Sequence, residues 1–149
     1  MLTQIRVKTL RSTLDCLPSR GTDGAAGMDL KAAIDLPVLL IAKHSMSVAC
    51  GFAIEIPRGY FGMICPRSGL ARNHRITVLN APGIIDSDYR GELGVTLINH
   101  SEVDFRIQPG ERIAQLLIMP VEMGFTLLPV ADLSGTERGD KGFGSTGRI

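Results

Sequence analysis

The sequence has few of the residues from which disulfide frameworks and metal centres are usually built. It holds only three cysteines in 149 residues, Cys16, Cys50 and Cys65, and none of them forms a CxxC pair. An odd number of widely separated cysteines argues against a disulfide framework or a zinc site and fits a reducing compartment. The three histidines are equally isolated, without an HxxxH or HExxH pattern. We therefore expect each histidine to lie at the surface or to be hydrogen-bonded.

Long apolar runs and an excess of one charge are also missing. The longest apolar run, LPVLLIA at 36–42, is far too short to cross a bilayer, and residues 1–15 lack the apolar centre of a signal peptide. Lys and Arg total 16 against 15 Asp and Glu, so composition indicates no basic face for nucleic acid. The prediction is a soluble cytoplasmic protein that binds neither membranes nor nucleic acid.

Apolar residues two positions apart are what the sequence has in plenty. They recur from 48 to 56, where PRG at 57–59 ends the pattern, and again from 103 to 107, while the apolar run at 113–121 reads as a strand buried on both faces. Together with 17 glycines and 8 prolines, which favour turns, this pattern predicts an all-β protein. Patterning alone leaves a barrel and a sandwich both open.

Two stretches depart from the strand pattern. SGLARNH at 68–74 indicates the only helix, about two turns long, with Ser68 as its N-cap. Residues 134–149 contain five glycines and little apolar content, which predicts a mobile tail. The expected organisation is one β-domain over 1–133, with 134–149 as a flexible C-terminal segment of the same domain.

Five short segments carry residues of the kind that binds ligands. Asp29 stands in an apolar context, where an acid needs a partner. Arg67 precedes the helix, whose first N–H groups suit an anion. Asp86 lies in an acidic turn between two strand-like stretches, and Gln115 is a lone amide inside an apolar run that must find structural or ligand partners. Arg138 begins a glycine-rich stretch that suits phosphate. Each also has a plain structural reading as a turn, a helix cap or a satisfied core amide.

Together, and in this order, the segments resemble the five motifs of the trimeric dUTPases. The matching stretches are AGMDL, PRSGLA, GIIDSDYRGE, GERIAQL and RGDKGFGSTG, spread from residue 26 to residue 147. The resemblance implies a jelly-roll-like distorted β-barrel and a homotrimer with active sites shared between chains. It also implies hydrolysis of dUTP to dUMP and pyrophosphate by attack of water on the α-phosphate, with Mg²⁺ on the triphosphate. That reaction keeps uracil out of DNA and supplies dUMP for thymidylate synthesis.

The same resemblance implies a role for each site residue. Asp86 is the general base, and Tyr89 lies under the deoxyribose, where it leaves no room for a 2′-hydroxyl. Uracil is recognised by Asn80 and by the backbone of a hairpin that includes Ile84, Ile85 and Gly94. Phosphates are held by Arg67, Ser68 and Gly69, and Ser68, Gln115 and Arg138 count with Asp86 as catalytic. The tail closes over the substrate with Arg138, Phe143, Gly144, Ser145 and Thr146. Asp29 meets the metal through water.

Two departures from the motifs and two rival functions qualify the resemblance. Lys141 stands where the family usually has glycine, and Met28 replaces a leucine or an aromatic residue. A dCTP deaminase-like enzyme shares the fold and part of the motif set, but it lacks the DSDY turn. A non-catalytic dUTP-binding regulator would have lost the base or the tail residues. Because the turn and the tail are both intact, the sequence favours the dUTPase.

Overall fold

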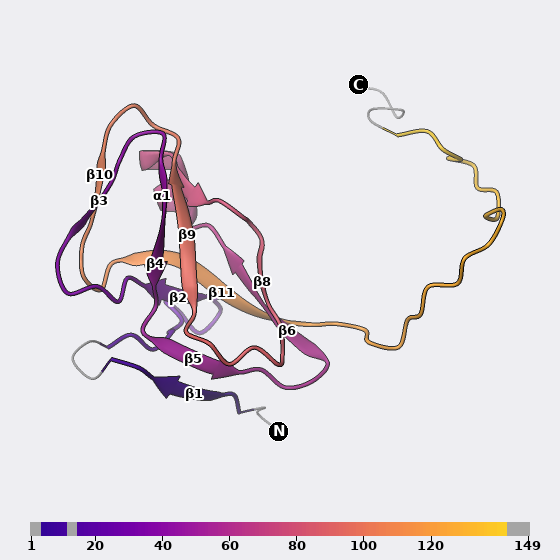
Figure 1. Cartoon of the computed structure of the whole chain (residues 1–149), viewed down its shortest axis with the longest axis horizontal. Helices are drawn as coiled ribbons and strands as arrows, with labels where there is room; N and C mark the ends of the chain where they lie inside the picture. Colours follow the sequence, from indigo (N-terminus) through magenta and orange to yellow (C-terminus); the bar gives the residue numbers. More distant parts are fainter. Residues whose placement is uncertain (1–3, 12–14, 143–149) are drawn as a thin grey trace.

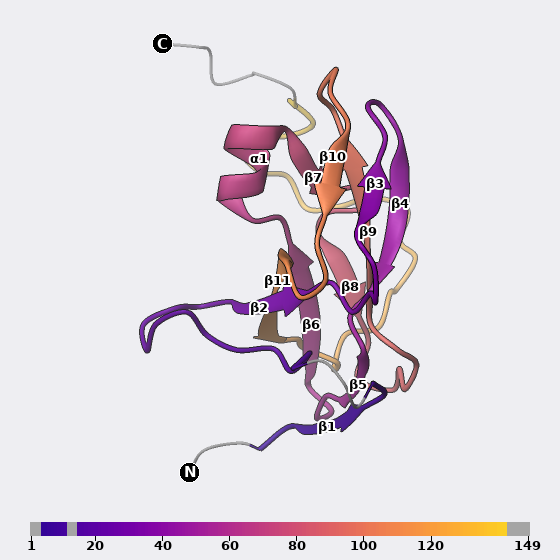
Figure 2. The same cartoon turned by 90° about the vertical axis from the view of Figure 1, so that its left-hand side faces the viewer.

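The computed structural model describes residues 4–11 and 15–142, and within them strands predominate (Figures 1 and 2). In chain order the elements are β1 Arg6–Thr9, β2 Met28–Lys31, β3 Val38–Leu40, β4 Ser45–Ala49, β5 Phe52–Glu55, β6 Tyr60–Cys65, α1 Ser68–His74, β7 Ile76–Val78, β8 Gly83–Ile85, β9 Gly94–Asn99, β10 Phe105–Ile107 and β11 Arg112–Pro120. The all-β prediction with one short helix is confirmed. No helix in the described residues is long and apolar enough to span a bilayer.

The described strands form four antiparallel sheets around one apolar core. Their orders are β1-β5, β10-β3, β2-β11-β6-β8 and β4-β9-β7. The core takes large side chains from all of these layers, among them Leu30, Phe52, Leu97, Ile107 and Leu116, each fully buried. Within the described residues the strands are hydrogen-bonded as separate sheets, not as one closed barrel.

The expected alternation over 48–56 is present, but it belongs to two strands instead of one. Cys50, Phe52 and Ile54 are buried as predicted. The chain nevertheless changes sheet at Gly51, because its φ of +77° ends the β4 ladder before β5 begins. A Cβ at residue 51 would lie 2.9 Å from the Cys16 sulfur, so only glycine fits this corner.

The helix occupies the predicted residues, but its N-cap differs from the prediction. Arg67 is the N-cap, with extended backbone at φ −89° and ψ 128°, and no side chain caps the helix. Ser68 is instead the first helical residue. This matters for the site, because the exposed first turn at Ser68 and Gly69 keeps backbone N–H groups that no side-chain cap occupies.

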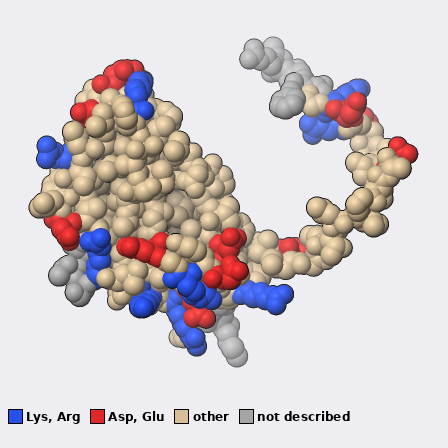
Figure 3. Space-filling view, viewed as in Figure 1, with Lys and Arg blue, Asp and Glu red and all other residues tan. Residues whose placement is uncertain are grey.

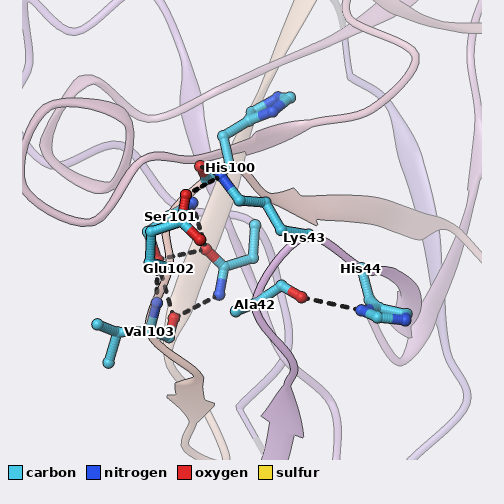
Figure 4. Close-up of polar contacts among 8 residues, drawn as sticks. Ala42, Lys43, His44, His100, Ser101, Glu102 and Val103 are labelled. Carbon is cyan, nitrogen blue, oxygen red and sulfur yellow. Dashed lines mark hydrogen bonds and ion pairs between the residues drawn. The ribbon is translucent and has the colours of Figure 1, made fainter.

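Polar groups join the loops at one end of the molecule (Figure 4). The Lys43 ammonium donates to the His100 carbonyl at 3.0 Å and pairs with Glu102 at 2.6 Å, while His44 Nδ1 lies 2.9 Å from the Ala42 carbonyl oxygen. A hydrogen-bonded role is therefore confirmed for His44. These contacts fix the loops that follow β3 and β9, and the His100 N–H joins the second loop to the end of α1 by donating to the Arg75 carbonyl at 3.0 Å.

After β11 the chain runs outward from the body as an extended arm, residues 121–133, followed by the start of the glycine-rich tail (Figure 1). The arm carries large apolar side chains that the body does not cover, such as Phe125 at 81% exposed and Leu127 at 100%. Among the described residues, the Arg138 side chain bonds within its own turn, where its Nε donates to the Lys141 carbonyl at 3.1 Å. The isolated chain thus leaves an apolar surface without a partner.

Candidate active site

The first group of motif residues lies where three strands meet. In the ladders, Gln115 of β11 stands opposite Asp29 of β2 on one side and opposite Cys65 of β6 on the other. The chain leaves β6 at Cys65 and reaches Arg67 two residues later. Sheet register therefore places Asp29, Gln115 and Arg67 side by side, although they are far apart in sequence.

Asp29 is the centre of this group. Its Oδ1 accepts a hydrogen bond from Arg67 Nε at 3.1 Å, and its Oδ2 accepts one from Arg112 Nη1 at 3.2 Å. Arg67 Nη1 also donates to the Arg112 carbonyl at 3.1 Å. We call this group the arginine cluster; it consists of Asp29, Arg67 and Arg112. Its two guanidinium groups and one carboxylate give it a net charge of +1. An acid in an apolar stretch was expected to need a partner, and here it has two.

Gln115 supports the same place. Its amide donates to the Pro66 carbonyl at 2.9 Å, which fixes the residue immediately before Arg67. On its other side the amide packs against Gly27, where a Cβ would collide with the amide oxygen. The partners of this amide are thus structural in the isolated chain, and they hold the segment that leads into α1. At Gly69, in contrast, nothing lies within 4 Å of a Cβ, so space is open in front of the helix.

The second group lies in the turn between β8 and β9, residues 86–93. Tyr89 donates its backbone N–H to the Asp86 carbonyl at 3.1 Å and its hydroxyl to the Glu92 carbonyl at 3.0 Å. Its ring covers Gly91, where a Cβ would lie only 2.6 Å from Tyr89 Cζ. The acidic turn predicted between two strand-like stretches is present, and it needs glycine at 91 so that the Tyr89 ring can fold back.

This turn closes one side of a small hollow. The hollow has a volume of about 180 Å³ and is lined by Ile84, Ile85, Asp86, Tyr89, Glu92, Leu93 and Gly94. The predicted hairpin is not a paired one: β8 pairs with β6, whereas β9 pairs with β4 and β7. Because β8 is the outer strand of its sheet, backbone groups at Ile84 and Ile85 stay available to a ligand in the hollow. Asn80 lies in the turn before β8, with its Nδ2 3.5 Å from the position of a Cβ on Gly83.

Asp86 differs from Asp29 in its surroundings. It is exposed, and its carboxylate makes no hydrogen bond or ion pair with another described residue. It lines the small hollow and also a larger one of about 1100 Å³, which Arg58 and Tyr60 border. The carboxylate is therefore free to act on a bound molecule or on water.

The two groups do not meet within one chain. In the β6–β8 ladder Ile85 stands opposite Gly62, so Asp86 lies near the beginning of β6, while Arg67 follows its end. At about 3.3 Å per residue the strand separates them by roughly 20 Å. Figure 2 shows α1 at one end of β6 and the end of β8 toward the other. A phosphate held at the arginine cluster is out of reach of Asp86 in the same chain.

The remaining motif residues belong to the tail. Arg138 and Lys141 lie in its described part, away from both groups, and the predicted site residues Phe143, Gly144, Ser145 and Thr146 fall outside the described residues. Arg112 was not among the predicted site residues. It could have been found as the basic residue that opens the strand carrying Gln115.

The cysteines take no part in either group. Burial raises the pKa of the Cys50 thiol to about 12, and burial also raises the pKa of Cys16. Both thiols therefore stay protonated at neutral pH and are poor nucleophiles. All three cysteines are free, in agreement with the sequence-based expectation.

Fold and site together define a β-sheet protein with two arginines held by one carboxylate and a separate carboxylate, unpaired among the described residues, beside a small edge-strand pocket. Comparison with known proteins gives the family. The dUTPase family model matches residues 16–147. The deoxyuridine 5′-triphosphate nucleotidohydrolase of Anaeromyxobacter sp. (strain Fw109-5) is 52% identical over 132 residues, 89% of this chain and 88% of the relative.

Two further proteins agree. The enzyme of the same name from Syntrophotalea carbinolica is 48% identical and covers 96% of both chains. The structure of the Staphylococcus bacteriophage 80alpha dUTPase with dUPNHPP has a TM-score of 0.89 at 30% identity, covering 98% of this chain and 99% of that one. The chain belongs to the dUTPase family. Its strands have the jelly-roll-like arrangement of that fold, as the motifs predicted.

Proposed function

We propose that the protein hydrolyses dUTP to dUMP and pyrophosphate by attack of water on the α-phosphate. The observation that carries this proposal is the unpaired Asp86 carboxylate beside the small hollow, in a chain whose family relatives are deoxyuridine 5′-triphosphate nucleotidohydrolases. Asp86 is the general base that takes a proton from the attacking water. Phosphoryl transfer otherwise needs positioning and charge stabilisation, which arginines and backbone N–H groups provide.

The hollow beside β8 is the uracil site in this proposal. The free edge of β8 at Ile84 and Ile85, with Gly94 and Asn80 nearby, offers backbone and amide groups to a planar base. Cytosine presents the opposite donor and acceptor pattern at two edge positions, so it would leave groups unpaired at about 1–3 kcal/mol each. Tyr89 lies where the deoxyribose follows, and its ring is fixed by the bond to the Glu92 carbonyl.

The phosphates bind at the other end of β6 in this proposal. Arg67 and the exposed backbone of Ser68 and Gly69 contact the triphosphate, and Gln115 supports them through Pro66. A guanidinium with several N–H donors suits phosphate oxygens better than an ammonium does. Ser68 is exposed and its hydroxyl is not used as a cap, which leaves it free for this contact.

A substrate must touch both ends of β6, and we therefore infer that one active site combines two copies of the chain. The base and sugar bind at Asp86 and Tyr89 of one subunit, and the phosphates bind at Arg67 of another. The homotrimer implied by the motifs provides this pairing three times. Two features support association: the exposed apolar arm at 121–133, and a broad face of the body with few charges (Figure 3).

The tail completes the site in the proposal. The segment 134–149 is the lid: Arg138 pairs with phosphate and Phe143 stacks on uracil. The triphosphate is covered by Gly144, Ser145 and Thr146. What supports this is the matching RGDKGFGSTG motif and the absence of any contact between Arg138 and the body within the described residues. The tail can thus reach a site on a neighbouring subunit.

Magnesium enters this proposal with the substrate. The described residues contain no group of three His, Cys, Asp or Glu side chains able to hold an ion, and arginines occupy both Asp29 oxygens. These residues do not fit a protein-held magnesium site. We therefore place Mg²⁺ on the triphosphate itself, and the predicted contact of Asp29 with the metal through water stays a prediction. A cytoplasmic location stays one too, supported by the cysteine pattern.

A pyrophosphate-release assay with dUTP, dCTP, dTTP and UTP in the presence of Mg²⁺ tests the function, with product mass as a second readout. The proposal expects release from dUTP alone, with dUMP as product. Ammonia from dCTP would identify the deaminase-like alternative. Binding of dUTP without turnover would identify a regulator, which the intact Asp86 turn and the named relatives disfavour.

A further inference from the structure

The strand that carries Arg112 has an irregularity that decides where this side chain points. Gln115 stands opposite Asp29, and in a regular antiparallel ladder Arg112 would then stand opposite Ala32. It stands instead opposite Lys31, because the register shifts between residues 112 and 114. A one-residue shift moves a side chain to the other face of the strand. The bulge therefore turns Arg112 to the face that carries Asp29.

Burial along β11 agrees with this reading. The two residues that follow Arg112 are both buried although they are neighbours, which regular alternation does not allow. β-bulges occur next to active sites, where they re-aim a side chain. The contact between Arg112 and Asp29 is thus part of the sheet's construction, not a chance meeting of long surface side chains.

The ion pairs of Asp29 are better shielded than the other pairs of the described chain. Asp29 is 17% exposed and Arg67 27%, whereas Arg6 and Glu55, for example, are 86% and 46% exposed. Two guanidinium groups side by side repel each other, and the shared carboxylate offsets that repulsion while fixing both geometries. Each guanidinium has five N–H donors, and the bonds to Asp29 and to the Arg112 carbonyl use only some of them.

We propose that Asp29 is a positioning residue that holds Arg67 and Arg112 side by side for the substrate triphosphate, and that Arg112 is a second phosphate-binding arginine. This rests on the proposed function and deepens it. Asp29 acts through the arginines, and its effect on nucleotide binding does not depend on a metal ion. Arg112 remains 55% exposed, so its free N–H groups are open to a ligand.

Binding of dUPNHPP, the imido analogue of dUTP, tests this on the full-length protein with and without Mg²⁺. The variants are Asp29→Asn, Arg112→Ala and the double variant, and the matched control is Asp35→Asn, which removes a carboxylate from the exposed pair with Arg11. We expect Asp29→Asn and Arg112→Ala each to weaken binding about tenfold or more, as for charged hydrogen bonds. The loss is the same with Mg²⁺ and with EDTA.

The double variant should lose less than the product of the two single losses, because both changes break one contact. Asp35→Asn should bind like the wild type. A loss for Asp29→Asn that appears only with Mg²⁺ would overturn the proposal in favour of a metal contact. Unchanged binding by Arg112→Ala, which is exposed enough to keep the fold, would equally overturn it.

An assay of dUTP hydrolysis by the wild-type protein distinguishes failure of the roles of Asp29 and Arg112 from failure of the proposed function. If the wild type hydrolyses dUTP but the Asp29 and Arg112 variants bind normally, only the positioning role fails. If the wild type neither binds dUPNHPP nor hydrolyses dUTP, the proposed function fails first. Steady-state kinetics give a further check. If Arg112 binds phosphate, Arg112→Lys, which keeps the charge but loses the planar guanidinium, should raise KM more than it lowers kcat.

Discussion

The two ends of β6 hold their charged groups in opposite ways. At the Arg67 end, the carboxylate, the arginines and the amide are all paired: Asp29 joins two arginines and Gln115 donates to the Pro66 carbonyl. At the Asp86 end, the carboxylate is exposed and meets no other described side chain. One end is built before substrate arrives, and the other leaves its reactive group free.

The two ends have different tasks in the proposed reaction, and these tasks account for the difference. Like charges that bind a triphosphate repel each other, so they need a counter-charge and fixed geometry to stand together. A general base needs a lone pair that no donor already occupies. Hydrogen bonds therefore fix the arginines, Tyr89 and the backbone around Asp86, while the Asp86 carboxylate itself remains unpaired among the described residues.

The largest expected effect comes from the unpaired carboxylate. Asp86→Asn keeps the shape of the side chain and removes the base, so kcat should fall by about 10²–10⁴-fold, the usual contribution of a positioned base. Binding of dUPNHPP, measured by calorimetry, should change little. Asp88→Asn, in the same turn, is the control and should keep most activity. Lost binding with an unchanged residual rate would contradict the role of Asp86.

Removing the tail should have the next largest effect. A chain truncated after Glu137 keeps every described strand and should remain folded and assembled, with most of its dUTP turnover lost because the closing residues are gone. Steady-state kinetics and light scattering give the two readouts. Full turnover by the truncated protein would exclude a lid role for 138–149.

A smaller effect is expected at the sugar. Gly91→Ala places a methyl group against the Tyr89 ring and should displace it. The preference for dUTP over UTP should then fall by about tenfold, which is the discrimination that one misfitting group in an apolar pocket typically causes. Gly21→Ala is the control, because nothing lies within 4 Å of a Cβ there. The ratio of kcat/KM for dUTP and UTP measures this discrimination. An unchanged ratio would mean that Tyr89 does not determine the preference for deoxyribose.

The last effect is on stability at high pH and leaves turnover at neutral pH unchanged; it concerns the core, which supports both ends. The pKa of Cys50 is raised to about 12 in the folded chain from an ordinary value near 9. Its contribution to stability is therefore complete below pH 9 and is lost as the pH rises toward 12, by up to about 1.4 kcal/mol per pH unit. Thermal unfolding between pH 8 and 11 should show a steeper fall for the wild type than for Cys50→Ala. Equal slopes would argue against a buried thiol that titrates.

Local features were predictable from sequence because they depend on neighbours along the chain. The helix at 68–74, the alternation at 48–56 and the need of Asp29 for a partner all follow from side-chain pattern. The break at Gly51 could not be predicted, since it depends on Cys16 and Ala33, which reach that corner only after folding.

The errors at the site have the same origin. Ser68 has the chemistry of an N-cap, but the chain enters the helix one residue earlier, through an extended Arg67. Arg112 could be noticed as the basic residue that opens the strand of Gln115, but the bulge that turns it toward Asp29 is not visible in the sequence pattern. The motifs implied sites shared between chains, but the spacing of their residues did not indicate that Arg67 and Asp86 lie at opposite ends of β6, because that separation depends on strand register.

Subunit mixing tests the central claim most directly. Asp86→Asn and Arg67→Ala chains, each nearly inactive, are unfolded together in equal amounts, refolded and assayed for pyrophosphate release from dUTP, with each variant refolded alone as the control. If a site takes Asp86 from one subunit and Arg67 from another, random mixing leaves one half times one half, or about a quarter, of all sites intact. Activity near a quarter of the wild-type value is the predicted result. Activity no higher than that of the separate variants, in assemblies shown to be mixed, would mean that each chain builds its own site.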